Sequence, residues 1–418
     1  MLRWRQVGAR WFALFPRPVV AMTDPHSAGP LAQPTLVVES RVDPIVEALA
    51  FDEPEPQALL DTAQGLWAVV FAGGIGTRFW PLSTARRPKQ VLALVTERPL
   101  ILDTILRLAP LVPPERILVV TSADIVDTLH EVIPEVPRIN MLVEPRPLGT
   151  AAALAWGAAE VSRRAGPETI FCALHADLAV AFPDELQSAI RRAATVAATA
   201  PVLVTIGAQP TRCETGFGYL QAGALMDPLV SRAEGGACRV DYFVEKPNAA
   251  LADTLIERGA LWNSGIFVWR AKVVLAELEQ HTRELTAGLP MLASGDLEQF
   301  AANVTSISID RGLLERSKKV VVLVAEFGWD DVGTWASLRR VRELDDTGNG
   351  IMGNAHCIDA SGNVIHADGQ CIVAYGISGM LVVSLDGLTF VTTLERASEL
   401  GPLLNALPGS VRSNPGRA

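Results

Sequence analysis

The chain has 418 residues, of which 49% are hydrophobic and 20% are charged, so it can bury a sizeable core in about two or three domains. Its 46 acidic and 36 basic residues give a net charge of −10, which argues against a general nucleic-acid-binding protein, because such proteins usually present a basic surface. Five cysteines without a CxxC pair and six histidines without an HExxH pattern argue against a disulfide framework and a structural zinc site.

Residues 1–65 combine prolines, acidic clusters such as FDEPEP and short apolar pieces, which predicts a partly disordered N-terminal extension. The run WFALF near its start is too short for a membrane span and poorly suited to a signal peptide. No other stretch approaches roughly eighteen uninterrupted apolar residues. We therefore expect a cytoplasmic protein whose partners include neither a membrane nor a nucleic acid.

Residues 66–344 are predicted to form an α/β domain with a Rossmann-like, mostly parallel sheet flanked by helices. Apolar runs of strand length, among them LWAVVFA, RILVV, INMLVE, TIFCAL and VLVTIGA, alternate with helix-like stretches such as LILDTILRLA and TAAALAWGAAEVSRR. Continuous apolar strands that alternate with helices are typical of a parallel sheet buried on both faces. The runs CRVDYFVEKP, SGIFVWRA and KKVVVLVAEFGW predict further strands of the same domain.

Residues 345–418 show a different pattern. Short β-like pieces are separated by glycine, asparagine and aspartate, as in GNGIMGNAHCIDASGNVIHADGQ. This spacing predicts a small C-terminal β-domain, with a few coils like those of a β-helix, rather than more α/β structure. The stretch ERASELGPLLNAL predicts a helix near the end of the chain.

Residues 71–90 read FAGGIGTRFWPLSTARRPKQ, and the chain has four basic residues and no acidic one between Phe71 and Thr96. A glycine-rich turn that follows a strand lies at the carboxyl edge of a parallel sheet, where ligands bind. Its N–H groups can approach phosphate oxygens because glycine has no Cβ. Arg78 and Lys89 would neutralise a leaving pyrophosphate. We therefore predict a phosphate site; the alternative is a tight turn with solvated arginines.

Two carboxylates are the natural candidates for a metal ion. Asp177 follows the strand-like run TIFCALHA, and Asp331 follows another strand within WDDVGTW. Magnesium takes one or two carboxylates together with phosphate oxygens and water. The structural alternatives are that Asp177 caps a helix or turn and that Asp331 is the N-cap of the helix that follows. Asp330 is a competing candidate for the metal ligand in WDDVGTW.

The glycine loop resembles the GGxGTRxxPLTxxxPK signature of sugar-1-phosphate nucleotidyltransferases, and its FWPLS and PKQ parts resemble the short bacterial mannose-1-phosphate guanylyltransferases (GDP-mannose pyrophosphorylases). The similarity continues in order through VEPRPLGTAAA, HADLAV, PTRCETGFGYL, FVEKPN, WNSGIFVWRA, SIDRGLLER and FGWDDVGTW, over about residues 66–340. It implies transfer of GMP from GTP to mannose 1-phosphate, with Mg²⁺ as cofactor. No general base is required, because the attacking phosphate is already an anion near neutral pH.

The resemblance also implies roles for individual residues. Arg78, Lys89 and Asp177 would be catalytic, and Asp177 and Asp331 would bind the metal. The nucleotide would be bound by Gly73, Gly74, Gly76, Thr77, Gly149 and Thr150, and the sugar phosphate by Gly216, Tyr219, Glu245, Lys246 and Asn263. The residues themselves allow structural alternatives, such as Thr150 as a helix cap and Tyr219 as a core aromatic.

Four positions depart from the family pattern, namely Leu148 and Gly149 in PLGTA, and His175 and Leu178 around the metal aspartate, where related enzymes usually read Pro-x-Asp-His. They leave open a nucleotidyltransferase for another hexose 1-phosphate or another nucleoside triphosphate. They also leave open a non-catalytic paralogue that binds sugar nucleotides and regulates a partner. The retained cations and carboxylates favour the enzyme, because a binding protein would not need all of them. A homodimer is also left open, with the C-terminal β-domain as one candidate for the contact.

Overall fold

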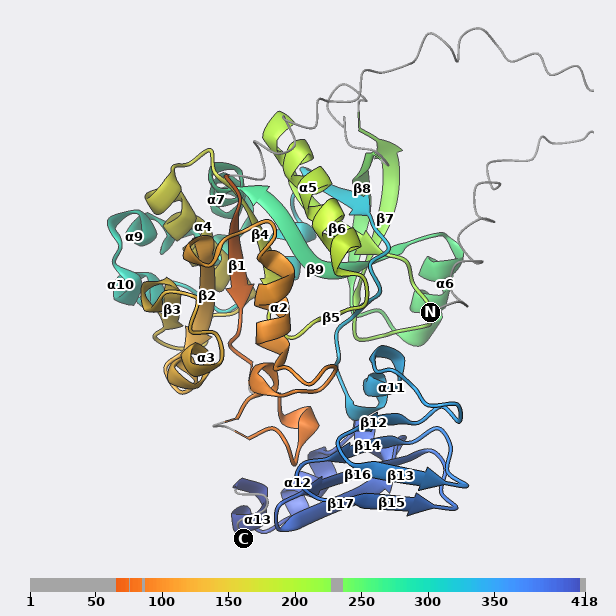
Figure 1. The fold of residues 1–418 in the computed structure, drawn as a ribbon. Coiled ribbons are helices and arrows are strands. Elements are labelled where there is room, and N and C mark those ends of the chain that lie inside the picture. The colour runs from red at the N-terminus through yellow and green to blue at the C-terminus, as the bar shows by residue number, and fades with distance from the viewer. Residues whose placement is uncertain (1–64, 75, 85–86, 227–235, 414–418) are drawn as a thin grey trace, which may run out of the picture. The chain divides into compact units, whose positions relative to one another are not determined.

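The computed structural model describes residues 65–74, 76–84, 87–226 and 236–413 (Figure 1). These residues belong to one unit that spans Glu53–Ala418. The predicted N-terminal extension, residues 1–65, lies outside the described residues apart from Gly65, and the predicted domain boundaries stay predictions. Among the helices of the described ranges, none combines the length and the apolar character needed to cross a lipid bilayer.

The centre of this unit is a nine-stranded sheet with the strand order β3-β2-β1-β4-β9-β6-β10-β8-β7. Its strands are β1 (Trp67–Phe71), β2 (Ile117–Ser122), β3 (Met141–Glu144), β4 (Ile170–His175), β6 (Leu203–Ala208), β7 (Gly218–Leu225), β8 (Ala237–Glu245), β9 (Leu261–Arg270) and β10 (Val320–Val324). Within this sheet, β8 and β9 run opposite to the other strands. The mostly parallel sheet confirms the predicted Rossmann-like α/β class.

Helices cover both faces of the sheet (Figure 1). They are α2 (Leu100–Leu108), α3 (Val126–Val132), α4 (Thr150–Ala165), α5 (Pro183–Thr199), α6 (Ala249–Glu257), α7 (Ala271–His281), α8 (Arg283–Thr286), α9 (Leu289–Ser294) and α10 (Leu297–Ala302). The short helix α11 (Leu338–Val341) packs instead with residues of the C-terminal strands. Ala68 and Val70 of β1 pack with α2, α3 and α5, whereas Val69 and Phe71 pack with α4, α7 and α10. Successive strand residues point to opposite faces, so a strand buried on both faces is apolar throughout.

A short ribbon joins two distant segments of the chain. The strand β5 (Ala179–Val180) pairs antiparallel with β11 (Trp329–Asp330), with Asp330 opposite Ala179. Asp177 lies just before β5 and Asp331 directly follows β11. The pairing therefore brings the two predicted metal-binding segments together.

The C-terminal residues form short stacked strands, as predicted. The strands β12 (Gly350–Met352), β14 (Val364–Ala367) and β16 (Met380–Leu385) pair in parallel, β17 (Leu388–Thr393) adds antiparallel to β16, and β13 (Ala355–Ile358) pairs in parallel with β15 (Ile372–Tyr375). Parallel pairing between alternate short strands, each one coil apart, is the arrangement of a β-helix. Between two coils, the buried Asn363 amide donates to Oδ1 of Asn349 at 2.9 Å.

The predicted terminal helix is shorter than ERASELGPLLNAL suggested. The helix α12 spans Gly401–Ala406 and α13 spans Gly409–Ser413, whereas Arg396–Ser398 forms only a 3₁₀ turn. Pro402 lies in the first turn of α12. A proline has no N–H to donate to a preceding turn, so it fits the start of a helix but not the middle of one that continues from Glu395.

One buried arginine ties the C-terminal strands to the α/β part. The Arg342 guanidinium donates to the carbonyl oxygen of Leu94 at 2.7 Å and to that of Ile365 at 3.2 Å. Its Nη2 lies 3.2 Å from Nδ1 of His366. A guanidinium can only donate, so Nδ1 of His366 must be the acceptor. Burial, together with the positive charge of Arg342, lowers the pKa of His366 from 6.5 to about 3.

This histidine predicts acid-sensitive stability. His366 is neutral in the folded protein, whereas in the unfolded chain it takes up a proton below its ordinary pKa of 6.5. The free energy of unfolding should therefore fall as the pH drops from about 6.5 towards 3. We expect thermal melts recorded between pH 7.5 and 5 to show a shallower loss for His366→Gln than for the wild type. Parallel pH profiles for the two proteins would contradict this assignment.

Candidate active site

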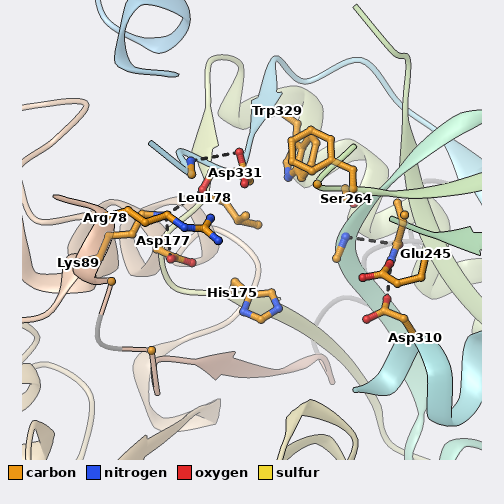
Figure 2. Close-up of a pocket in the computed structure, with 18 of the residues that line it drawn as sticks. Arg78, Lys89, His175, Asp177, Leu178, Glu245, Ser264, Asp310, Trp329 and Asp331 are labelled. Atoms are coloured by element: carbon orange, nitrogen blue, oxygen red, sulfur yellow. Dashed lines mark hydrogen bonds and ion pairs between the residues drawn. The ribbon is translucent and has the colours of Figure 1, made fainter. Parts of the chain in front are cut away.

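A cavity of about 490 Å³ opens where the chain leaves the carboxyl ends of β1 and β4 and meets the β5–β11 ribbon. Of the predicted site residues, it is lined by Gly74, Gly76, Arg78, Lys89, Asp177, Gly216, Glu245, Asn263 and Asp331. Figure 2 shows Arg78, Lys89 and Asp177 grouped at one side of this cavity and Glu245 at the other. The carboxyl edge of the sheet thus collects residues from motifs that are far apart in the chain, as expected for this fold class.

Lys89 joins the two predicted metal-binding segments. Its Nζ lies 2.9 Å from Oδ2 of Asp177 and donates to the backbone carbonyl of Asp331, also at 2.9 Å. The side chain is 9% exposed, so its positive charge is held in a partly desolvated position that faces the cavity. A buried lysine fixed by two partners is a preorganised site for the negative charge of phosphate groups.

Packing of the glycine loop against Lys89 explains one of its glycines. Gly76 has a φ of +67°, and a Cβ at this position would collide with the Cβ of Lys89. Glycine is therefore required here both for the backbone conformation and for the close approach. The loop is also held at Gly74, whose carbonyl accepts from Nε2 of Gln90 at 2.8 Å.

The two adjacent carboxylates of WDDVGTW have different surroundings. Asp330 is 4% exposed, and its carboxylate accepts from Arg340 at 2.8 Å and lies 3.5 Å from the guanidinium of Arg212. Asp331 lines the cavity, and its Oδ1 accepts from the N–H of Gly333 at 3.2 Å. The turn that follows is capped by Thr334, so Asp331 does not act as its N-cap. Asp331 is therefore the carboxylate of this pair that is available to a ligand.

The two candidate metal ligands differ in their proton affinity. Burial would raise the pKa of Asp177, but the neighbouring Lys89 ammonium holds it below its usual value. Burial and the adjacent Asp330 carboxylate raise the pKa of Asp331 above its usual range. A cation bound beside Asp331 would stabilise the ionised form of its carboxylate.

The donor set fits a magnesium ion that also binds substrate. Among the described residues, no group of three histidine, cysteine or carboxylate side chains could hold a metal alone. Magnesium commonly takes one or two carboxylates and completes its shell with phosphate oxygens and water. The cavity is lined by four carboxylates, Asp177, Glu245, Asp310 and Asp331, and by the cations Arg78 and Lys89. The phosphate-bearing substrates that the sequence resemblance implies would add further negative charge, which would favour a divalent cation.

The opposite side of the cavity carries the predicted sugar-binding residues Glu245 and Asn263. The Nζ of Lys246 lies 2.5 Å from Oε1 of Glu245, but Lys246 itself is exposed and lies outside the cavity lining. Tyr219 is fully buried and lies outside the cavity lining. Its hydroxyl donates to the carbonyl of Glu214 at 2.9 Å and so holds the loop that precedes Gly216.

The predicted nucleotide-binding residues are only partly brought to the cavity. Gly73, Gly149 and Thr150 lie outside its lining. The side chain of Thr77 is outside the described part of the structure, so its predicted role stays a prediction. Gly149 caps α4 with a φ of +86°, and a Cβ there would approach the carbonyl of Ile307 to 2.7 Å. The Thr150 hydroxyl accepts from the N–H of Ile309 at 2.9 Å. The start of α4 is therefore packed against residues 306–309, and a base-binding role for Gly149 and Thr150 stays a prediction.

Two of the titratable residues that line the cavity were not predicted as site residues. His175, at the end of β4, lines the cavity between Asp177 and Glu245 (Figure 2). Asp310 lines it beside Glu245, at the start of a π-helical turn, Asp310–Leu314. The sequence offered one signal for Asp310, a single carboxylate between Ile309 and Leu313 within the SIDRGLLER motif, but no residue near it in the chain indicated a partner.

Comparisons with known proteins agree with this geometry. The family model described as nucleotidyl transferase matches residues 67–347. The chain is 32% identical over 351 residues to a mannose-1-phosphate guanylyltransferase of Sinorhizobium fredii (strain NBRC 101917 / NGR234). The aligned region covers 81% of this chain and 67% of that protein. It is 34% identical over 339 residues to mannose-1-phosphate guanylyltransferase 2 of Escherichia coli O157:H7, with 78% and 70% covered.

A solved structure is similar over nearly its whole length. It is the crystal structure from Thermus thermophilus named mannose-1-phosphate geranyltransferase, which superposes with a TM-score of 0.74 at 34% identity and covers 82% of this chain and 98% of its own. Fold, motif order and relatives all lead to the same assignment. The chain is an enzyme of the nucleotidyl transferase family, in the branch of the mannose-1-phosphate guanylyltransferases.

Proposed function

We propose that the protein transfers GMP from GTP to mannose 1-phosphate, giving GDP-mannose and pyrophosphate, with Mg²⁺ as cofactor. One observation carries this proposal: a single cavity holds Arg78 and Lys89 at one side and Glu245 and Asp310 at the other, and Asn263 donates to Asp310. Such a cavity offers positive charge to phosphates and hydrogen-bond partners to a sugar. The names of the relatives support GTP and mannose 1-phosphate as the substrate pair.

The reaction needs positioning and charge stabilisation rather than proton transfer. A phosphate oxygen of the sugar phosphate attacks the α-phosphorus of GTP, the new P–O bond forms, and the bond to the β-phosphate oxygen breaks, so that pyrophosphate leaves. The nucleophile is already anionic near neutral pH. Lys89 and Arg78 would stabilise the charge that develops on the transferred and leaving phosphates.

Asp177 and Asp331 would hold the magnesium ion. When bound, the ion would offset the charge of the phosphates and reduce their repulsion from each other and from the carboxylates of the cavity. The other groups act without it: Lys89 keeps the segments of Asp177 and Asp331 together, and Glu245 and Asn263 orient the sugar.

The test is a grid of pyrophosphate-release assays with Mg²⁺. GTP, ATP, UTP, CTP and dTTP are crossed with the 1-phosphates of mannose, glucose, galactose and N-acetylglucosamine. We expect the dominant rate for GTP with mannose 1-phosphate and its loss on chelation with EDTA. A dominant rate for another pair would retain nucleotidyl transfer but refute the proposed substrates. No rate on any pair, with GDP-mannose still bound by the folded protein, would identify a non-catalytic paralogue.

A further inference from the structure

Asp310 faces the sugar side of the cavity without a cationic partner. It begins the π-helical turn Asp310–Leu314, which follows the segment packed against the start of α4. Among the described residues, no arginine, lysine or histidine forms an ion pair with its carboxylate. A partly buried carboxylate that lacks a counter-charge usually serves a ligand or a hydrogen-bond network.

The described network fixes the position of this carboxylate. Nδ2 of Asn263 donates to Oδ1 of Asp310 at 3.0 Å, and the hydroxyl of the fully buried Thr205 donates to Oδ1 of Asn263 at 3.0 Å. The N–H of Gly265 lies 3.4 Å from the same Asn263 oxygen. An N–H can only donate, so the Asn263 oxygen must face Gly265 and its amide nitrogen must face Asp310. Thr205 thus orients Asn263, and Asn263 orients Asp310.

Two acidic side chains of the cavity lie opposite the cations Arg78 and Lys89. Glu245 and Asp310 lie together on the side away from Arg78 and Lys89 (Figure 2). Burial, and then the negative charge of Glu245, raise the pKa of Asp310 to about 6. The carboxylate is therefore largely ionised at neutral pH, yet it lacks a strong partner. This side repels phosphate and offers acceptors to neutral donors, which in a hexose phosphate are the ring hydroxyls.

We propose that Asp310 determines sugar specificity, by accepting a hydrogen bond from a ring hydroxyl of the hexose 1-phosphate beside Glu245 and Asn263. This inference rests on the proposed function, because it names how that site selects its sugar. The phosphate points to Arg78 and Lys89, and the hydroxyls point to the acidic side. An epimer with one hydroxyl displaced leaves a buried acceptor unpaired, so a site of this kind rejects it strongly. Thr205 is a positioning residue that acts through Asn263.

The experiment compares Asp310→Asn with the wild type in the pyrophosphate-release assay. Asparagine keeps the size of the side chain and can still accept from Asn263, but it loses the charge. We expect the KM for the preferred hexose 1-phosphate to rise about tenfold or more, with the KM for the nucleotide changed by less than about twofold. The preference between mannose 1-phosphate and its 2-epimer, glucose 1-phosphate, should shrink.

Two further variants separate this role from folding. Glu315→Gln removes a carboxylate just after the same turn, at an exposed position outside the cavity lining, and should behave as the wild type. Thr205→Val removes only the hydroxyl that orients Asn263, and should raise the KM for the sugar phosphate by a few-fold without changing the KM for the nucleotide. Thermal melts check that each variant is folded.

Each outcome has one meaning. An unchanged sugar KM and an unchanged epimer preference in Asp310→Asn would overturn the role of Asp310 while leaving the proposed function intact. If Asp310→Asn does not fold, an unchanged sugar KM in Thr205→Val would overturn it in the same way. A wild type that releases no pyrophosphate with any substrate pair would refute the proposed function, and this inference with it.

Discussion

Asparagine in place of Asp331 is expected to lower kcat by roughly a hundredfold to a thousandfold while leaving the protein at least as stable as the wild type. Asp331 lines the cavity, and burial and Asp330 raise its pKa, so its charge is disfavoured in the folded state when no ligand is present. Removal of that charge relieves a repulsion between adjacent carboxylates. The same change removes a predicted ligand for magnesium. Activity and stability should therefore move in opposite directions.

Asparagine in place of Asp330 should have the opposite effects: a loss of stability and a smaller loss of activity. Asp330 is 4% exposed and interacts with Arg340 and Arg212. Removal of one partner of a fully buried pair costs about 3–5 kcal/mol. The cost here should be smaller, because the Arg340 and Arg212 side chains are 38% and 23% exposed and water screens the charges left behind. Asp330→Asn should still be destabilised, and it should retain more activity than Asp331→Asn at a temperature where both are folded.

Denaturant unfolding curves and initial rates of pyrophosphate release, measured on the same two preparations, check this pair of predictions. The magnesium dependence of the residual rate adds a second readout, since Asp331→Asn should require more metal. Equal activity in the two variants, or a larger loss of activity in Asp330→Asn, would mean that the wrong carboxylate has been assigned to the metal.

Lys89→Met is expected to lower kcat by roughly a hundredfold to a thousandfold, the usual cost of losing one preorganised group that stabilises developing negative charge. Lys89 is 7% exposed and lies 2.9 Å from the Asp177 carboxylate, and methionine preserves its length and apolar stem without the charge. Arginine is a poor replacement, because its planar guanidinium does not fit the position of a compact ammonium.

The matched control is Lys319→Met. The Nζ of Lys319 lies 2.7 Å from the largely buried carboxylate of Glu277, outside the cavity lining. Both variants therefore remove a lysine from a carboxylate that is at least partly buried, but only one does so at the proposed site. Saturating initial rates, with thermal melts to confirm folding, should show an almost unchanged kcat for Lys319→Met. A similar loss of rate in both variants would indicate a general loss of stability instead of a catalytic role for Lys89.

Much of the fold follows from local patterns in the chain. The uninterrupted apolar runs predicted strands buried on both faces, and alternate residues of β1 do pack into two different clusters. The glycine- and asparagine-rich spacing after residue 345 predicted the stacked short strands. These features depend on side-chain periodicity over a few residues, which a sequence displays directly.

Several site residues were also visible locally. The glycine loop with Arg78 and Lys89 stands out because its positive charge contrasts with the acidic chain around it. Asp177 and Asp331 stand out because each follows an apolar strand. Their common location was an expectation from the carboxyl-edge rule, and the β5–β11 pairing is what brings them together.

Only the tertiary structure shows how the adjacent Asp330 and Asp331 differ and which side chains contact Asp310. Asp330 and Asp331 are adjacent in the chain, and their difference comes from arginines supplied by other segments. Asp310 acquires its place through Asn263 on β9, which no local pattern connects to it. By itself, the sequence determined the strands, the glycine turn and the kinds of chemistry available. The folded chain decided which charges are paired and which face the cavity, because burial and pairing depend on contacts between residues that are distant in sequence.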